Sequence, residues 1–208
     1  MAALAEEEVF RSRSVRRVIW ITLGLNLAVA GVKIAYGTLV HALSIQADGF
    51  HSLSDSANNL VGLLGVWLAS RPADDGHPYG HHKFEVIASG VVGLSLLAMA
   101  FEVARGAVAR LSGGAEALPS IDARAFVVLL ITLAINVGVA RWERARGLAL
   151  ESPFLLSDAT HTRSDVFVTL GVLLTVIFVR SGYPVIDVLS AFAIACFIAW
   201  AGIGVLRE

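Results

Sequence analysis

Six long apolar stretches follow one another along this chain, and they constrain its fold more than any other feature. They cover residues 15–40, 43–70, 84–111, 121–144, 153–180 and 184–206. A helix of about 20 predominantly apolar residues is long enough to cross the hydrocarbon core of a bilayer. The stretches therefore predict an all-α membrane protein, a bundle of six transmembrane helices that follows a short polar segment, residues 1–14.

The composition supports a membrane location and excludes several other classes of protein. Of the 208 residues, 56% are hydrophobic and 16% are charged, whereas a soluble domain has about 45–50% apolar and about 25% charged residues. Disordered chains are poor in apolar residues, so disorder is excluded. The net charge of −1 argues against a nucleic-acid partner, which calls for a basic excess. With one cysteine, any metal must be bound by His, Asp or Glu.

The arginines and lysines that flank the stretches predict the orientation. If the spans alternate in direction, most of these residues fall on one side, which should be cytoplasmic. That side holds Arg11, Arg13, Arg16, Arg17, Arg71, Lys83, Arg141, Arg144, Arg146 and Arg207, and the other holds Arg105, Arg110, Arg124 and Arg180. We therefore expect a plasma (inner) membrane protein with both termini in the cytoplasm and, because the chain stops after the sixth stretch, no C-terminal cytoplasmic domain.

The second and fifth stretches each contain the pattern D-x-x-H-x-x-x-D. It is formed by Asp48, His51 and Asp55 in one stretch, and by Asp158, His161 and Asp165 in the other. Spacings of three and four residues place the three side chains of each pattern on one face of a helix. The two helices should run antiparallel, so that the patterns can meet at their centres.

Charged residues at the centre of a membrane span are costly, at about 2.5–3.5 kcal/mol each, unless they neutralise something or face water. A divalent cation offsets this cost, and two imidazoles with two carboxylates supply a tetrahedral ligand set. The candidate ligands are His51, Asp55, His161 and Asp165. The alternative is that the polar side chains merely join helices by hydrogen bonds.

Asp48 and Asp158 lie outside this proposed ligand set. Asp48 should lie toward the outer mouth and Asp158 toward the cytoplasmic mouth, where each could relay cations or protons. The alternative for both is a local hydrogen bond. For Lys33, Glu102, Arg163 and Asp187 we expect ion pairs between helices.

Residues 43–55 and 156–165 resemble the signature helices of the cation diffusion facilitator family, and the His/Asp pairing on both resembles its zinc-type members. The resemblance implies a six-helix membrane domain, usually a homodimer, that exports a divalent metal from the cytoplasm in exchange for protons. It also implies that His51, Asp55, His161 and Asp165 form the transport site. Most members carry a cytoplasmic metal-binding domain after the sixth helix, which this sequence lacks.

The loop between the second and third stretches is dense in metal-ligand side chains. Gly76, Pro78 and Gly80 favour a turn that can bring these side chains together. Asp74, His77 and His81 match a loop metal site of some family members, with Asp75 and His82 as alternatives. A polar loop in contact with water is stable without a metal, so the alternative is that this loop binds no metal.

The predicted function is efflux of a divalent cation by alternating access around the buried His/Asp site, and Zn²⁺ is the favoured cargo. Because a ligand imidazole must be neutral and a ligand carboxylate ionised, cation binding should displace protons. Cd²⁺, Co²⁺, Fe²⁺ and Mn²⁺ remain open as cargo, and no prosthetic group is expected. One alternative is an intramembrane zinc hydrolase, although neither motif has the Glu of a general base; another is a metal-sensing protein without transport.

Overall fold

The computed structural model describes residues 2–69, 82–112, 119 and 121–207, and all regular structure in these parts of the chain is α-helical. This confirms the predicted all-α fold. Beyond residue 12, side chains are described for most positions outside 58–59, 61–86 and 88–89. The helices are α1 (Ala2–Leu39), α2 (Leu43–Ala69), α3 (His82–Leu111), α4 (Ala123–Ala149), α5 (Pro153–Arg180) and α6 (Val185–Arg207).

Five of these helices contain a segment long and apolar enough, by length and composition, to cross a membrane. The segments are Arg13–Leu39, Gly90–Leu111, Ala123–Ala149, Pro153–Arg180 and Val185–Arg207. In α2, side chains are described continuously only for residues 43–57, and these include Asp48, His51, Asp55 and four serines. Because α2 packs against α1, α3, α5 and α6, its neighbours shield these polar groups from the outside of the bundle.

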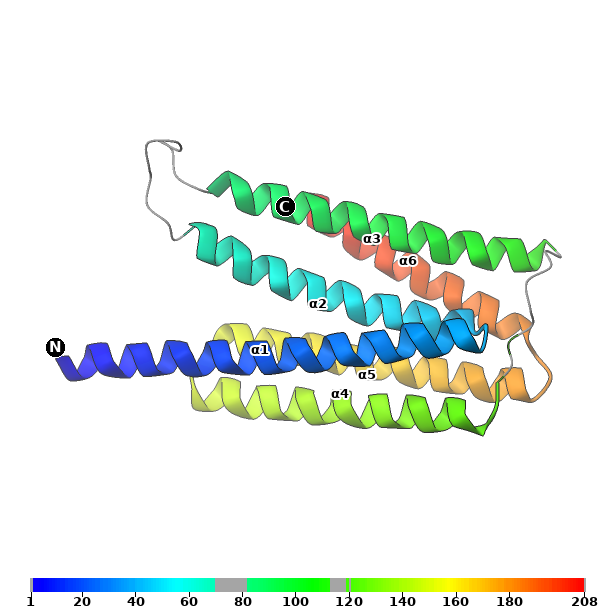
Figure 1. Ribbon diagram of the computed structural model, residues 1–208, viewed down its shortest axis with the longest axis horizontal. Helices are drawn as coiled ribbons and strands as arrows, with labels where there is room; N and C mark the ends of the chain where they lie inside the picture. The colour runs from blue at the N-terminus through cyan, green and yellow to red at the C-terminus, as the bar shows by residue number, and fades with distance from the viewer. Residues whose placement is uncertain (1, 70–81, 113–118, 120, 208) are drawn as a thin grey trace.

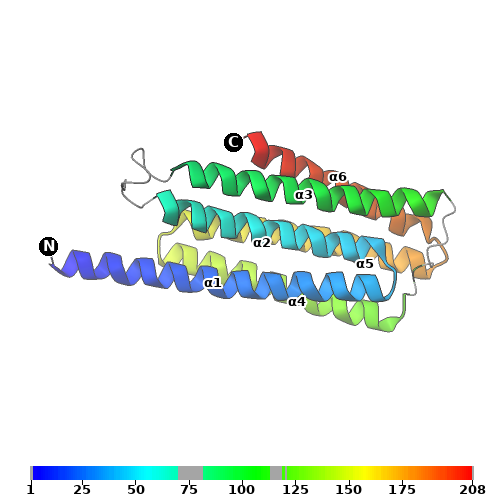
Figure 2. The same cartoon turned by 45° about the horizontal axis from the view of Figure 1, so that its top comes forward.

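The bundle has α2 at its centre. On one side of α2, α3 and α6 lie next to each other; on the other side lie α1, α4 and α5 (Figures 1 and 2). The ribbons of α1 and α2 are close together at the turn that joins them and move apart toward the N-terminal end of α1 (Figure 1).

Two helix boundaries differ from the expected stretches. The polar segment expected at residues 1–14 is continuous with the first span, because α1 is helical from Ala2. At its other end, α4 continues past Arg144 to Ala149. Local capping explains where the next helices begin: the Asp122 side chain accepts a hydrogen bond from the N–H of Arg124 at 2.9 Å, and Ser152 caps α5 immediately before Pro153.

Small residues allow α1 and α2 to approach closely beside the polar positions. A Cβ atom on Gly49 would lie 2.8 Å from the backbone nitrogen of Ile34 and 3.0 Å from the Cβ of Lys33. Real Cβ atoms do not approach backbone nitrogen so closely, so only glycine fits at this position without a shift of α1. The contact holds Lys33 and the polar face of α2 against each other.

Candidate metal site

His51, Asp55 and Asp165 form a cluster of three potential metal ligands between α2 and α5. One ligand atom from each lies within 4.8 Å of the other two. The His51 Nε2 atom is 3.7 Å from Asp55 Oδ2 and 3.6 Å from Asp165 Oδ1. Two ligand atoms bound tetrahedrally to Zn²⁺, at about 2.0–2.1 Å from the metal, would lie about 3.4 Å apart. The cluster is therefore close to the spacing that a bound cation requires.

The cluster is shielded from water and is incompletely hydrogen-bonded. His51 and Asp165 are buried, and Asp55 is partly buried. His51 Nε2 and Asp55 Oδ2 have no hydrogen-bond partner. Within the described part of the chain, neither Asp55 nor Asp165 forms an ion pair with a lysine or arginine. Buried polar atoms are rarely left without partners, so the arrangement suits a cation that all three side chains can bind.

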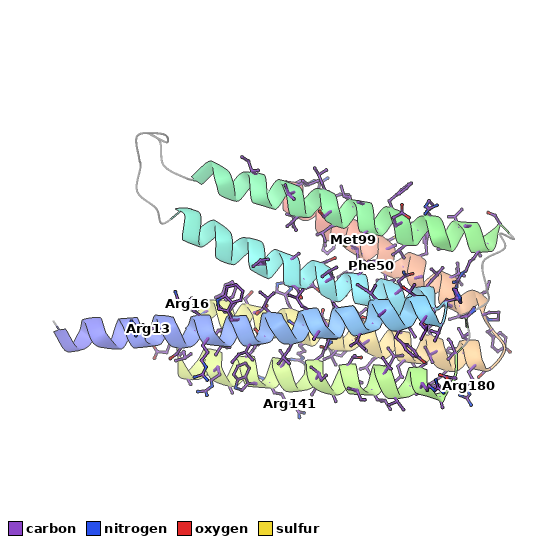
Figure 3. The ribbon with its side chains drawn as sticks, in the orientation of Figure 1. Arg13, Arg16, Phe50, Met99, Arg141 and Arg180 are labelled. Carbon is purple, nitrogen blue, oxygen red and sulfur yellow. The ribbon has the colours of Figure 1, made fainter. Side chains whose placement is uncertain are left out.

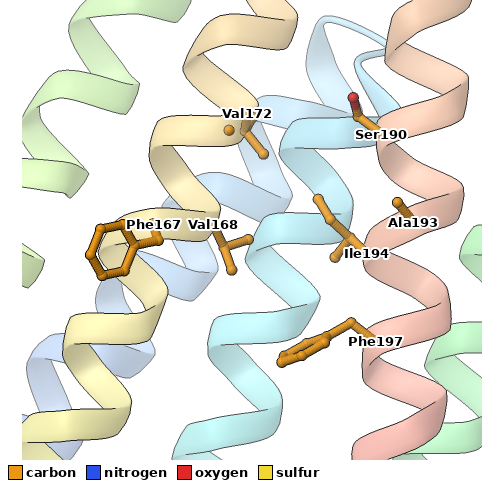
Figure 4. A pocket seen from close by; sticks show the side chains of 8 residues that line it. Phe167, Val168, Val172, Ser190, Ala193, Ile194 and Phe197 are labelled. Carbon is orange, nitrogen blue, oxygen red and sulfur yellow. The ribbon is translucent and has the colours of Figure 1, made fainter.

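An aromatic side chain of α6 completes the wall around His51. The Phe197 ring meets the His51 ring edge to face, at 5.3 Å between ring centres and 77° between planes. Phe197 also lines an apolar cavity of about 300 Å³ between α5 and α6, together with Phe167, Val172 and Ile194 (Figure 4). The imidazole is thus held in an apolar environment on this side, which restricts its orientation.

His161, expected as the fourth ligand, is not part of the cluster. Its side chain is exposed, whereas the neighbouring Thr162 is buried. Between residues 158 and 169, the buried polar positions of α5 span an arc of about 60° around the helix axis, and His161 lies about 70° from the centre of that arc. In this conformation α5 therefore presents Asp165 to the cluster and His161 to the outside. These four buried positions are Asp158, Thr162, Asp165 and Thr169.

Asp48, expected as a relay residue, is engaged by a buried lysine. Lys33 of α1 is fully buried, and its Nζ atom lies 2.9 Å from Asp48 Oδ2. Lys33 Nζ also donates to the hydroxyls of Thr169 at 2.8 Å and Ser52 at 3.3 Å, and Thr169 donates to Asp48 Oδ1 at 3.4 Å. This ion pair connects α1, α2 and α5 one helical turn from His51 and neutralises the carboxylate.

Asp158, the other expected relay residue, lies near a buried glutamate that the sequence reasoning did not single out. Glu143 of α4 is fully buried, and its Oε1 atom has no hydrogen-bond partner. Its Oε2 atom accepts a hydrogen bond from Thr162 at 3.1 Å, and Thr162 is also hydrogen-bonded to the Asp158 carbonyl. In the sequence, Glu143 is a single acidic residue near the end of the fourth apolar stretch, which could have indicated a buried carboxyl. Because Arg141 and Arg144 lie close to it, however, this segment resembles the solvated polar end of a helix.

The ion pairs expected between helices are present in two of four cases. Lys33 pairs with Asp48 as described, and Asp187 of α6 pairs with Arg110 of α3 at 3.1 Å. Asp187 also accepts hydrogen bonds from the Leu43 and Ser44 N–H groups, at 2.9 and 3.0 Å, so that it caps α2 from another helix. The expectation was wrong for Glu102, which pairs with Arg105 of the same helix at 2.7 Å.

The expectation was also wrong for Arg163, which forms no ion pair with a described carboxylate because its exposed side chain points away from the buried face of α5. The predicted loop site, Asp74, His77 and His81, lies outside the described residues, as do its alternatives Asp75 and His82.

Comparison with known families explains the two polar helices. Residues 19–208 match the family model of the cation efflux transmembrane domain. The chain belongs to the cation efflux family. This is the cation diffusion facilitator family that its signature helices resemble, and the chain thus belongs to a family of membrane transporters and not to an enzyme family, as predicted.

Several relatives cover most of the chain at moderate identity. An uncharacterized transporter of Methanocaldococcus jannaschii is 32% identical over 90% of this chain and 65% of its own length. A manganese efflux system protein of Bacillus subtilis is 26% identical over 86% of this chain and 62% of its own length. The magnetosome protein MamB of a Magnetospira species is 28% identical over 89% and 63%. The chain spans a little under two thirds of the length of these relatives.

Proposed function

We propose that this chain forms the membrane domain of a divalent-cation efflux transporter and that His51, Asp55 and Asp165 bind the transported ion. The observation that carries the proposal is the meeting of one imidazole and two carboxylates between α2 and α5, with two of their polar atoms lacking any hydrogen-bond partner. Family membership supports transport rather than hydrolysis. No sequence motif or described side chain supplies the glutamate of a zinc hydrolase beside this cluster.

Exchange of the cation for protons follows from the chemistry of the ligands. A cation bound to this cluster requires a neutral imidazole and ionised carboxylates, so protons compete with the cation for the same atoms. Histidine has an ordinary pKa of about 6.5 and therefore responds to modest differences in pH across a membrane. We propose that a proton gradient drives the cation out by this competition.

Zn²⁺ is our proposed cargo, with His161 as a fourth ligand in a second conformation. Rotation of α5 by about 40° would turn His161 to the direction that Asp165 faces now, because the two positions are four residues apart at about 100° per residue. A site with two imidazoles favours Zn²⁺ over Mn²⁺, which prefers oxygen ligands. Because one relative is a manganese efflux protein, the transport experiment must compare Mn²⁺ with Zn²⁺. Cd²⁺, Co²⁺ and Fe²⁺ are tested in the same way.

We also propose the orientation and assembly that the sequence indicates. The excess of arginine at the end of the bundle that contains the N-terminus and the α4–α5 turn supports a cytoplasmic location for both termini in the plasma (inner) membrane. The family resemblance supports a homodimer. Asp74, His77 and His81 remain a proposed second site in the loop, and Asp158 a proposed relay.

Transport into sealed proteoliposomes tests the proposal. With a pH gradient imposed, the wild-type chain should move Zn²⁺, and Asp165→Asn and His51→Ala should each reduce the initial rate at least tenfold. Asp122→Asn, which removes a carboxylate outside the cluster, is the matched control and should retain wild-type rates. Zn²⁺ binding without flux in the wild type would favour a sensor. Wild-type flux in both cluster variants would refute the site.

A further inference from the structure

A second pocket lies between α4 and α5, on the side of α5 away from the buried cluster. Its volume is about 670 Å³. Three arginines line it, Arg141 and Arg144 from α4 and Arg163 from α5, and the rest of the lining is mostly apolar, including Val137, Leu156 and Phe167. The pocket therefore combines concentrated positive charge with a surface that lipid chains can contact.

The three arginines are exposed and have no carboxylate partner among the described residues. None of them forms an ion pair with a carboxylate in the part of the chain that the structure describes. By contrast, Lys33 and Arg110 both pair with aspartates. Unpaired guanidinium groups on an apolar span are unfavourable, so an anion from outside the chain would stabilise them.

From this arrangement we infer that the pocket binds the phosphate group of an anionic membrane lipid. Guanidinium groups bind phosphate through paired hydrogen bonds, and basic pockets between transmembrane helices bind anionic headgroups. The lipid's acyl chains would lie against the apolar lining. The inference rests on the membrane location of the bundle and does not depend on the cargo of the transport site.

The three arginines lie in the parts of α4 and α5 that are nearer to the turn between these two helices. Arg163 lies ten residues from the start of α5, about 15 Å along the helix at 1.5 Å per residue, and long arginine side chains can extend from such positions toward the interface. Arg141 is on the outer side of α4, and Arg13 and Arg16 of α1 lie toward the same end of the bundle, whereas Arg180 is at the other (Figure 3). The sequence predicts that the end with the α4–α5 turn is cytoplasmic.

Lipid retention measured by native mass spectrometry tests the inference on the full chain. Delipidated protein is mixed with phosphatidylglycerol or phosphatidylcholine, and the fraction of protein that carries one lipid is measured. The wild type should retain phosphatidylglycerol in preference to phosphatidylcholine. Arg141→Gln, Arg144→Gln and Arg163→Gln should each weaken retention about fivefold, and the triple variant should lose the preference.

Arg13→Gln is the matched control, because it removes the same charge from an exposed position at the same end but outside the pocket. It should retain phosphatidylglycerol as the wild type does. An equal loss in Arg13→Gln and Arg163→Gln would overturn the inference in favour of general charge attraction. Equal retention of the two lipids would also overturn it, and so would displacement of the lipid by inorganic phosphate at comparable concentration, which would indicate a soluble anion.

Discussion

Removal of the buried lysine Lys33 should destabilise the bundle strongly. Lys33→Met keeps the length of the side chain but leaves the Asp48 carboxylate without its cationic partner at a fully buried position. Loss of one partner of a buried ion pair costs about 3–5 kcal/mol, chiefly because the other charge stays buried and uncompensated. The Thr169 hydroxyl already donates to Asp48 Oδ1 in the wild type, so keeping this hydrogen bond in the variant offsets none of that cost.

The double variant Lys33→Met/Asp48→Asn separates the ion pair from the packing of the lysine chain. With both charges absent, no uncompensated charge remains, and we expect most of the lost stability to return, to within about 1–2 kcal/mol of the wild type. Asp48→Asn alone should be destabilising, because it leaves the lysine charge unpaired. The cycle should therefore show a coupling energy of several kcal/mol between residues 33 and 48.

Thermal unfolding in detergent, followed by circular dichroism, measures this cycle. For a chain of this size, each kcal/mol corresponds to roughly 2–4 °C in Tm, so Lys33→Met should lower Tm by about 6–20 °C. A Tm of Lys33→Met within about 2 °C of the wild type would show that the charge of Asp48 needs no compensation from Lys33. A double variant as unstable as Lys33→Met would show that the chain packing of Lys33, and not its charge, is what matters.

Two further predictions concern other parts of the bundle. Gly49→Ala should lower Tm by several degrees because its Cβ would lie 2.8 Å from the Ile34 backbone nitrogen, whereas Gly24→Ala, with no atom within 4 Å of its Cβ, should leave Tm unchanged or raised; equal effects would contradict the close packing of α1 and α2. At the start of α4, partial removal from water acts to raise the pKa of Asp122, but hydrogen bonds from the Tyr36 hydroxyl and the Arg124 N–H outweigh it and lower the pKa below its usual value. A carboxyl with a lowered pKa stabilises the folded state fully above its unfolded pKa of about 3.9, and loses this effect as the pH falls through the lowered value. The Tm difference between wild type and Asp122→Asn should therefore be present at about pH 6 and shrink in acid; a difference that grows in acid would contradict the assignment.

The sequence predicted the elements of this fold better than their relative positions. Apolar length specified the helices, and the three- and four-residue spacing placed Asp48, His51 and Asp55 on one face of α2. That Lys33 meets Asp48 depends on how α1 and α2 are aligned, and the only local signal was Gly49, whose need for close contact is visible once both helices are placed.

Similar limits apply to α5 and α4. Periodicity puts His161 near the same face as Asp165, but the rotation of α5 about its axis decides which of them points inward, and packing against α2, α4 and α6 sets that rotation. Glu143 could not be distinguished from a solvated residue at a helix end until α4 was seen to extend to Ala149 and to bury its side chain.

Anomalous diffraction from crystals soaked with Zn²⁺, measured on both sides of the zinc absorption edge, is the most direct test of cation binding inside the bundle. We expect a peak between α2 and α5, about 2.0–2.2 Å from His51 Nε2 and from one oxygen each of Asp55 and Asp165. The same peak should be absent from crystals of Asp165→Asn. Zinc peaks confined to surface histidines, with none between these two helices, would contradict the proposed transport site.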